Sequence, residues 1–582
     1  MTSLHTRSLI LLLLMLLVSS GSAKPSFTWW TTNALVKVRP SDVPPSIQQG
    51  ITLHAASNEF EAFQIVLRND SAAVPDIDVE VSDLTGPSGS VISSSNVTIY
   101  FERYLNLSRP SSIDGGVGEW PDPLIPRVDR YEHERRNAFP FTLAKGRNQP
   151  LWIEIYVPPK TQPGRYEAQA TVLSGSAIQA VIPVSLDVWE FELPSTSSLR
   201  TAFGFNGVIA LKQHAGRYTN DDDLRSISQV YTRAALLHRV SAFGGPLIPP
   251  PFTHKAGAMT VDWSLYDAEV GPFLNGTALS KGDPLPGART TSVELRTHGG
   301  LDTDRKKILY WREWVRHFDK KGWLNRLFNY VWDEPTAAQM PGVKKSAALA
   351  HEAEHRLRNL VTSPLTKALD GPIDIWSPLI NCFETKPGSP DFCEPTVPRR
   401  AYDPEIRRHK SVWWYQSCAS HGCNIVGGEY FTGWPSYVID TGAVSNRIMP
   451  WMSWKYRIDG ELYYNMVEAY SREADPLEDV FLHGGNGDGT LFYPGRPNTI
   501  GGATHIPLES VRLKLIREGL EDYEYFVLLS NLTDSASVDR WVDKLVHNTY
   551  TFSPLPEDLY RVRQELGDEI QRRGRAMRGR GN

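Results

Sequence analysis

The periodicity of the apolar residues changes at about residue 198, and this change limits the possible folds more than any other feature of the sequence. Before it, short runs with apolar residues at alternate positions, such as 77–81 and 151–157, are separated by turns rich in Pro, Gly and Ser. Alternation with a period of two is typical of strands. The segment from about 25 to 195 therefore predicts a β-sandwich with one buried face on each sheet.

After residue 199, short apolar runs alternate with helical patterns. Eight strand candidates are present, at 201–205, 239–243, 259–263, 326–332, 359–362, 373–376, 412–415 and 460–464. Helices are expected at 221–237, 304–321, 343–357 and 510–529. Eight strands that alternate with helices predict a (β/α)8 barrel of the TIM type, in which residues 245–300 form an elaborated loop.

The predicted domains are a signal peptide (1–23), a β-sandwich (24–197), a (β/α)8 catalytic barrel (198–533) and a helical C-terminal extension (534–582). The extension carries one apolar face, formed by Leu559, Val562, Leu566 and Ile570. It ends in a basic run that includes Arg572 and Arg580, which we interpret as a solvated tail. The chain has a net charge of −5, so no nucleic-acid partner is expected.

The first 23 residues have the pattern of a secretory signal peptide. Arg7 precedes an apolar run of ten residues, 9–18, and small residues at 21–23 precede a cleavage site after Ala23. Ten apolar residues are too few to span a bilayer, which takes about 20. We therefore expect a secreted or luminal protein without stable membrane insertion, with an uncleaved anchor as the alternative.

Two further features fit export. Five N-x-S/T sequons permit glycosylation in a eukaryotic source, at Asn69, Asn96, Asn106, Asn275 and Asn531. The four cysteines match no common zinc spacing, and export favours disulfides among Cys382, Cys393, Cys418 and Cys423. Of the three possible connectivities, the closest pairs in sequence are Cys382 with Cys393 and Cys418 with Cys423.

The strand candidate at 326–332 is followed directly by two carboxylates, Asp333 and Glu334, and then by Pro335. The C-terminal ends of barrel strands point at the active site, so this pair is a candidate for acid–base chemistry. The same residues also suit the start of a helix, with Asp333 as the N-cap and Pro335 in the first turn. The local sequence leaves both interpretations open.

Two rival motifs suggest other chemistry. Residues 351–355 match H-E-x-x-H, in which His351 and His355 would bind zinc and Glu352 would act as the base of a peptidase. No suitable third ligand follows, since Asp374 falls inside a strand candidate. The glycine-rich run at 484–489 lacks the following helix that a phosphate site needs, so we interpret it as a mobile loop at the mouth of a barrel.

Five motifs occur together and in order. They are Trp-Asp-Glu-Pro at 332–335, Ile-Asp-Ile-Trp-Ser-Pro at 373–378, Val-Trp-Trp-Tyr-Gln at 412–416, the segment 487–495 and the helix 516–525. With the sandwich segments 56–64 and 163–166, they make the chain resemble glycoside hydrolase family 123 and its uncharacterised relatives, over about 30–530. The helix 516–525 is taken as structural, although Arg512 or Arg517 could reach the site.

The resemblance implies a retaining β-N-acetylgalactosaminidase with Asp333 and Glu334 as the catalytic pair, acting on a glycan or glycolipid. In this mechanism the sugar's 2-acetamido oxygen attacks the anomeric carbon. Asp333 would orient the acetamido group and Glu334 would serve as acid and base. Candidate substrate contacts are Tyr415 for the acetamido carbonyl, and Trp376, Trp414, Trp451, Tyr493 and Asp488.

No cofactor or metal is expected for this chemistry. The alternatives are a non-catalytic carbohydrate-binding protein on the same scaffold and the zinc peptidase. Ten of the 17 Trp fall between Trp311 and Trp454, a density that suits sugar stacking but equally suits a core. An inverting enzyme would need a second carboxylate farther from Glu334, for which Asp374 and Asp488 are the candidates.

Overall fold

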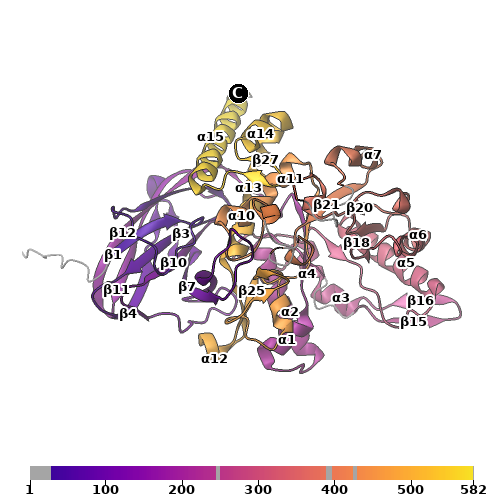
Figure 1. The fold of residues 1–582 in the computed structure, drawn as a ribbon, viewed down its shortest axis with the longest axis horizontal. Coiled ribbons are helices and arrows are strands. Elements are labelled where there is room, and N and C mark those ends of the chain that lie inside the picture. Colours follow the sequence, from indigo (N-terminus) through magenta and orange to yellow (C-terminus); the bar gives the residue numbers. More distant parts are fainter. Residues whose placement is uncertain (1–27, 244–248, 389–395, 422, 424–428, 581–582) are drawn as a thin grey trace, which may run out of the picture.

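A computed structural model describes residues 28–243, 249–388, 396–421, 423 and 429–580. The predicted signal peptide and Cys393 lie outside these residues. Figure 1 shows a β-sandwich on one side of the molecule and the elements of a parallel barrel on the other, with α13 (Val511–Leu532) between them. None of the described helices combines the length and apolar character that crossing a membrane requires.

The sandwich consists of two sheets. The first has the order β1 (Thr28–Asn33), β3 (Glu59–Arg68), β10 (Asn148–Val157), β7 (Val97–Leu107) and β8 (Gly118–Pro126). The second has the order β2 (Ile51–Ser57), β12 (Ala177–Glu192), β11 (Gly164–Ser174), β4 (Val74–Val81) and β9 (Phe141–Leu143), with β5 (Leu84–Thr85) and β6 (Val91–Ile92) beside it. The predicted all-β N-terminal region is confirmed.

The first sheet buries both of its faces, so the expectation of one buried face per sheet was wrong here. Along β10, Leu151, Ile153 and Ile155 face the second sheet. The alternate residues Trp152 and Tyr156 are also buried, in the cluster that includes the core of the barrel domain. The reason is that the barrel domain covers the outer face of this sheet.

The C-terminal part contains eight parallel strands in one sheet. In spatial order they are β14 (Ala242–Phe243), β13 (Arg200–Gly204), β22 (Gly460–Tyr463), β21 (Ser411–Tyr415), β20 (Ile375–Trp376), β19 (Arg358–Val361), β18 (Leu327–Trp332) and β17 (Val293–Glu294). The first strand in sequence pairs with the last, and β14 approaches β17 without a ladder between them. The sheet is thus a nearly closed barrel with sequential strand order.

One of the eight predicted strands is misplaced. The candidate at 259–263 overlaps β16 (Ala258–Val261), which pairs with β15 (Phe252–Lys255) in a separate antiparallel hairpin. The third barrel strand is instead β17, two residues long and inside the segment predicted as a loop. Only Val293 and Leu295 are apolar in the segment 290–298, so periodicity does not distinguish β17 from a loop, whereas an exposed hairpin strand shows the expected alternation.

The helices of the barrel domain surround this sheet incompletely. The long ones are α1 (Gly207–Ala215), α2 (Asp221–Leu237), α5 (Asp304–Lys321), α6 (Met340–Ala353) and α13. Helices α2 and α5 have the predicted bounds, because each begins after a capping side chain, that of Asn220 and of Thr303. After β19 the structure describes only a short 3-10 turn, at Lys367–Leu369. After β20 it describes 3-10 turns at Ile380–Cys382 and Arg399–Tyr402 and the single-turn helix α7 (Asp403–Ile406).

The helix α13 joins the two parts through buried ion pairs. Arg517 pairs with Glu154 of β10 at 2.6 Å, and Arg512 pairs with Asp122 of β8 at 2.8 Å. All four side chains are essentially inaccessible to solvent. The motif at 516–525 therefore builds the domain interface, and neither arginine reaches the end of β18.

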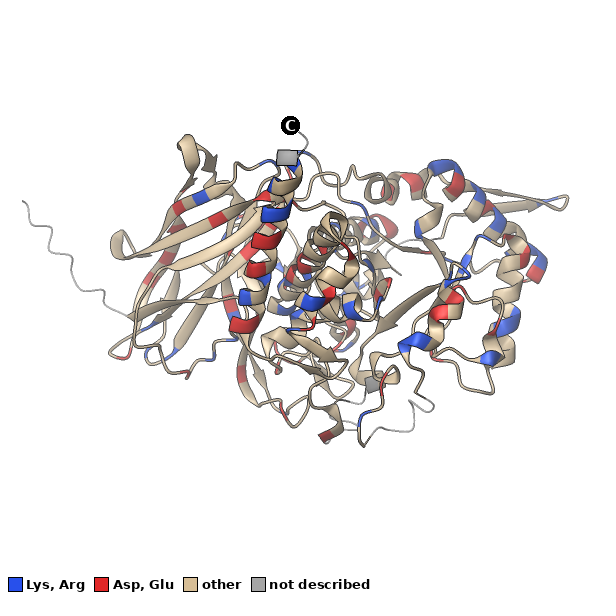
Figure 2. Cartoon of the chain, turned by 90° about the horizontal axis from the view of Figure 1, so that it is seen from above, with Lys and Arg blue, Asp and Glu red and all other residues tan. Residues whose placement is uncertain are grey.

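The C-terminal extension contains α14 (Ser535–Val542), a hairpin of β27 (Val546–Asn548) and β28 (Thr551–Phe552), and α15 (Pro556–Arg580). The predicted apolar face of α15 is buried. Acidic and basic residues both line this helix in Figure 2. Because Arg575 and Arg578 pair with Glu190, and Arg572 with Glu569, the basic run is largely neutralised by neighbouring carboxylates.

The sequons differ in exposure. Asn106, Asn275 and Asn531 are exposed, and Asn96 is half-buried. Asn69 is only 6% exposed and its side-chain oxygen accepts a hydrogen bond from the Ser71 backbone. In the folded chain, the exposed sequons are therefore better glycosylation candidates than Asn69.

Candidate active site

Asp333 and Glu334 lie directly after β18, the fourth strand of the barrel, at its C-terminal end. The next helix, α6, begins only at Met340, with Gln339 at its N-cap position. The alternative interpretation of Asp333 as a helix cap was therefore wrong. Glu334 has a φ of 41°, a left-handed conformation that costs a non-glycine residue about 1–3 kcal/mol and is concentrated at functional sites.

Asp333 is oriented by two hydroxyl groups. Tyr330 Oη donates to Asp333 Oδ1 at 2.8 Å, and Thr362 Oγ1 donates to the same oxygen at 2.9 Å. The Thr362 oxygen in turn accepts the backbone N–H of Glu334 at 2.7 Å. This one threonine, just after β19, thus fixes both the Asp333 side chain and the unusual backbone of Glu334.

Glu334 accepts hydrogen bonds from two hydroxyls on one carboxylate oxygen. Tyr415 Oη donates to Glu334 Oε1 at 2.5 Å, and Ser420 Oγ donates to the same atom. Burial, together with the nearby charge of Glu334, raises the pKa of Tyr415 well above its usual value. Tyr415 therefore stays protonated and remains a hydrogen-bond donor at every pH at which the protein works.

A cavity of about 440 Å³ opens beside these groups. Besides Glu334 and Tyr415 it is lined by hydroxyl and apolar side chains, which include Thr336, Thr362, Ser363, Pro364, Leu379 and Ser420. Among the described residues that line it, Glu334 is the only ionisable carboxylate. Its size and its mixture of polar and apolar walls suit one small polar ligand group.

The other aromatic candidates do not line this cavity. Trp376, Trp414, Trp451 and Tyr493 are all fully buried. Trp414 packs against Phe383 at a ring distance of 5.7 Å. Trp451 donates its indole N–H to Asp522 of α13 at 2.9 Å. The prediction that these rings stack on a sugar is not supported by their positions in the core.

Strand alternation explains the difference between Tyr415 and Trp414. One buried cluster collects residues from five neighbouring barrel strands, so these residues face the barrel interior: Phe328, Leu360, Ile375, Trp413, Tyr415 and Leu462. Trp376 and Trp414 occupy the alternate positions and belong to the cluster that includes the surrounding helices. Only the interior set can reach a site at the strand ends.

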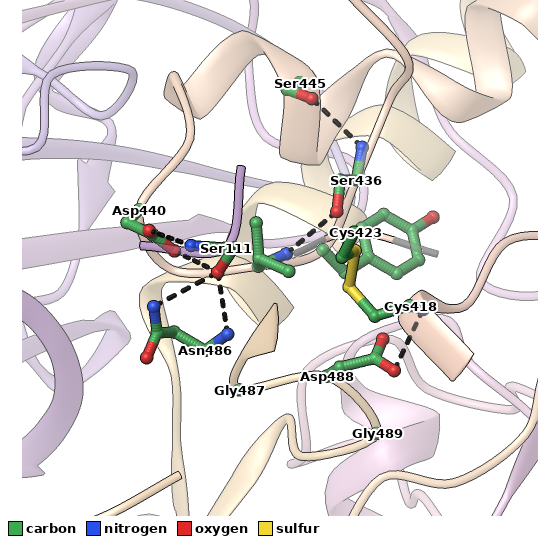
Figure 3. The surroundings of a disulfide bond; sticks show 12 residues. Ser111, Cys418, Cys423, Ser436, Asp440, Ser445, Asn486, Gly487, Asp488 and Gly489 are labelled. Atoms are coloured by element: carbon green, nitrogen blue, oxygen red, sulfur yellow. Dashed lines mark hydrogen bonds between the residues drawn. A yellow bond between two sulfur atoms is a disulfide. The ribbon is translucent and has the colours of Figure 1, made fainter. Parts of the chain in front are cut away.

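Asp488 lies in the glycine-rich segment and is 1% exposed. It accepts hydrogen bonds from the Cys418 backbone at 3.0 Å and from Tyr464 Oη at 2.9 Å. Burial raises the pKa of Asp488 to about 6. These contacts give it a supporting role beside α8 (Cys418–His421), and Figure 3 shows it next to the Cys418–Cys423 disulfide.

The interpretation of 484–489 as a mobile loop was wrong. Gly485 and Asn486 form β24, which pairs with β23 (Phe481–Leu482), and Asn486 is buried. A Cβ atom at Gly485 would lie 2.4 Å from Cys418 Sγ. Close packing against Cys418 thus explains the glycine at position 485.

One of the two disulfides expected from sequence proximity, Cys418–Cys423, is present. Cys382 is also disulfide-bonded, and its predicted partner Cys393 lies outside the described residues. The described part of the chain contains no free cysteine.

The zinc-peptidase alternative does not fit the structure. The helix α6 ends at Ala353, so His355 lies beyond it, and its side chain is 83% exposed. His351 Nε2 instead contacts Asp374 Oδ2 at 2.8 Å. Asp374 precedes β20, at the end of the barrel opposite to Glu334, which also removes it as an inverting base. Within the described residues, no group of three or more potential metal ligands converges.

Sequence reasoning missed Tyr330, Thr362 and Ser420. Tyr330 could have been found, because it alternates with Phe328 on the strand that precedes the acidic pair and therefore shares its interior face. Thr362 could have been found by the same argument, because it directly follows the last apolar residue of the strand candidate at 359–362. Ser420 carries no such signal, because its approach to Glu334 depends on a short helix distant in sequence.

Comparison with known proteins agrees with this description. The sequence model of the glycoside hydrolase 123 N-terminal domain matches residues 37–174, and that of the glycoside hydrolase 123 catalytic domain matches residues 309–529. No curated protein matches the chain.

Among solved structures, a family 123 glycoside hydrolase from Clostridium perfringens is similar over 94% of this chain and 97% of its own, with a TM-score of 0.65 and 15% identity. A family 39 glycoside hydrolase from Bacteroides cellulosilyticus covers 81% of this chain and 82% of its own, with a TM-score of 0.31 and 11% identity. A xyloglucanase from Bacteroides ovatus covers 81% of this chain and 98% of its own, with a TM-score of 0.27 and 11% identity.

The match to the glycoside hydrolase 123 catalytic domain, over a nearly closed parallel barrel, defines a glycoside hydrolase. The two matched domains span more than half of the sequence and occur in the expected order. The chain belongs to glycoside hydrolase family 123.

Proposed function

We propose that the protein is an exported, retaining exo-glycosidase that releases β-linked N-acetylgalactosamine, or a related N-acetylhexosamine, from a glycan or glycolipid. The observation that carries this proposal is the arrangement of Asp333 and Glu334. They are adjacent in sequence, their carboxylates accept hydrogen bonds from different hydroxyl groups, and Glu334 is the only carboxylate among the described residues that line the cavity.

This arrangement favours a nucleophile supplied by the substrate. A retaining enzyme that forms a glycosyl-enzyme needs two carboxyl groups about 5–5.5 Å apart across the scissile bond. In the proposed alternative, the 2-acetamido oxygen attacks the anomeric carbon while Glu334 protonates the departing oxygen. Asp333 accepts the acetamido N–H and stabilises the positive charge of the oxazolinium ring.

The second half of the reaction reverses these roles. A water molecule attacks the anomeric carbon, and the bond between this carbon and the oxygen of the oxazolinium ring breaks. Glu334 takes the proton from water. Because Glu334 Oε1 accepts both hydroxyls, Oε2 is the oxygen that carries the proton in the first half and receives it in the second.

The first test is a panel of aryl glycosides that differ at C2 and C4. We expect cleavage of the aryl β-N-acetylgalactosaminide and none of the aryl β-galactoside, because only the former contains the internal nucleophile. Comparable cleavage of both would refute substrate assistance. Binding without cleavage of any member would indicate a carbohydrate-binding protein instead.

The second test concerns the anomeric configuration of the product. Two successive attacks at the same carbon restore the original configuration, so the first product is expected to be the β-anomer. NMR within the first minutes, before mutarotation, reports this directly. An α-anomer would instead show that water attacks first, which needs a base about 6.5–9.5 Å from Glu334.

A further inference from the structure

The carboxylate of Glu334 depends on a segment far from it in sequence. Ser420 belongs to the single turn of α8, which follows β21, and its hydroxyl donates to Glu334 Oε1. Tyr415, the other donor, is anchored on β21 itself. The position of Ser420 therefore depends on whatever fixes α8.

Two bonds at Cys418, the first residue of α8, fix this turn. Its backbone N–H donates to Asp488 Oδ2 at 3.0 Å, and its sulfur forms the disulfide with Cys423 (Figure 3). Gly485 packs so closely against Cys418 that no Cβ atom fits between them. The turn is thus held on one side by the segment 485–488 and on the other by a covalent bond.

The segment that carries Asp488 is itself anchored to both domains. Arg512 of α13 donates to the Gly487 carbonyl at 2.8 Å. From the sandwich, Ser111 Oγ accepts the backbone N–H of Asn486 at 2.7 Å, as Figure 3 shows. Asp440 accepts the Ser111 backbone N–H at 2.7 Å. A continuous set of buried bonds therefore connects the sandwich to α8.

We propose that Ser420 is a positioning residue for the acid–base Glu334, and that the Cys418–Cys423 disulfide holds Ser420 in place. This inference rests on the proposed role of Glu334. The Ser420 hydroxyl restricts the carboxyl group to one rotamer and directs its proton to Oε2, where the leaving oxygen is expected. A hydroxyl donor bonds a carboxylate more strongly than a neutral carboxylic acid.

Removal of this donor should change the pH dependence of kcat/KM, which removal of a merely structural residue would leave unchanged. In Ser420→Ala, Glu334 should keep its proton to higher pH, so the alkaline limb of the kcat/KM profile should move up by about 0.5 to 1 unit. At the wild-type optimum, kcat should fall about tenfold because the carboxyl group is less well oriented. Ser420→Thr keeps the hydroxyl and should restore the wild-type profile. Ser226→Ala, at an exposed helical serine of α2, is the control.

A second measurement separates this inference from the proposed function. Titration of the Glu334 carboxyl carbon by ¹³C NMR, assigned with Glu334→Gln, needs no substrate. An upward shift in Ser420→Ala supports the Ser420 contact even if the wild-type protein cleaves no aryl glycoside, an outcome that would refute only the proposed function. Identical titrations of Ser420→Ala and the wild type would overturn the role of Ser420.

The disulfide is tested with Cys418→Ala/Cys423→Ala, after its melting curve shows that it is folded. The same shift as in Ser420→Ala is expected, with no further shift when the substitutions are combined. Additive shifts, or a wild-type titration in the cysteine variant, would overturn the role of the disulfide. Cys418→Ser/Cys423→Ser, which removes only this disulfide, provides the same comparison if the alanine variant does not fold.

Discussion

Replacement of Glu334 by Gln is expected to lower kcat for an aryl β-N-acetylgalactosaminide by about 10²- to 10⁴-fold. The amide keeps the shape of the side chain and its bonds to Tyr415 and Ser420, but it cannot donate the proton that the leaving oxygen needs. Leaving groups that depart as stable anions need no such proton, so the first step should lose least with them. Water activation stays impaired, and the cyclic intermediate should then accumulate.

The measurement is kcat/KM, which reports the first step, across aryl substrates of graded leaving-group acidity. The variant should show a steeper dependence on leaving-group acidity than the wild type. Glu352→Gln makes the same change on the exposed surface of α6 and should leave every rate unchanged. If folded Glu334→Gln retains near-wild-type activity, Glu334 is not the acid–base residue.

Replacement of Asp333 by Asn is expected to reduce kcat by about 10²- to 10³-fold with all leaving groups alike. Its charge is needed when the acetamido oxygen attacks and the ring becomes positive, a step that every substrate shares. Asn cannot stabilise that charge, although Tyr330 and Thr362 still fit beside it. The loss should therefore show no trend with leaving-group acidity, unlike the loss in Glu334→Gln.

A thiazoline analogue of the closed ring provides an independent measurement of the role of Asp333. It should bind wild type tightly and Asp333→Ala far more weakly, because the site is complementary to the reacting state. Calorimetry gives both affinities, with Asp370→Asn as an exposed control. Equal affinities of wild type and Asp333→Ala would contradict the assignment.

The barrel could be predicted because most of its strands are longer than three residues and bounded by strong helix signals. Helices α2 and α5 illustrate this, since an asparagine or threonine cap precedes each one. The strand β17 could not be predicted, because it lies in a polar segment without the apolar neighbours that mark the equally short strands β14 and β20. The hairpin strand β16 was mistaken for it because local alternation does not show which sheet a strand will join.

The site could be predicted only where it follows the chain locally. The sequence singles out the proposed pair, Asp333 and Glu334, because a strand leads directly into it. The tryptophans were misassigned because composition indicates an aromatic-rich region without showing which face of a strand each ring occupies. Tyr415 and Trp414 are neighbours in sequence, yet one touches Glu334 and the other packs beneath the helices.

The buried ion pairs of α13 also limit how this enzyme can be divided or recombined. Arg512 and Arg517 belong to the catalytic half, but their counter-charges, Asp122 and Glu154, belong to the sandwich. A barrel expressed alone would leave both cations without these two carboxylates at a newly exposed surface, and a foreign sandwich would have to place carboxylates at the same points. Through Arg512 the loss would extend to the Gly487 carbonyl, and so to the segment beside the active site. The sandwich is therefore part of the hydrolase itself and cannot be exchanged as an independent accessory module.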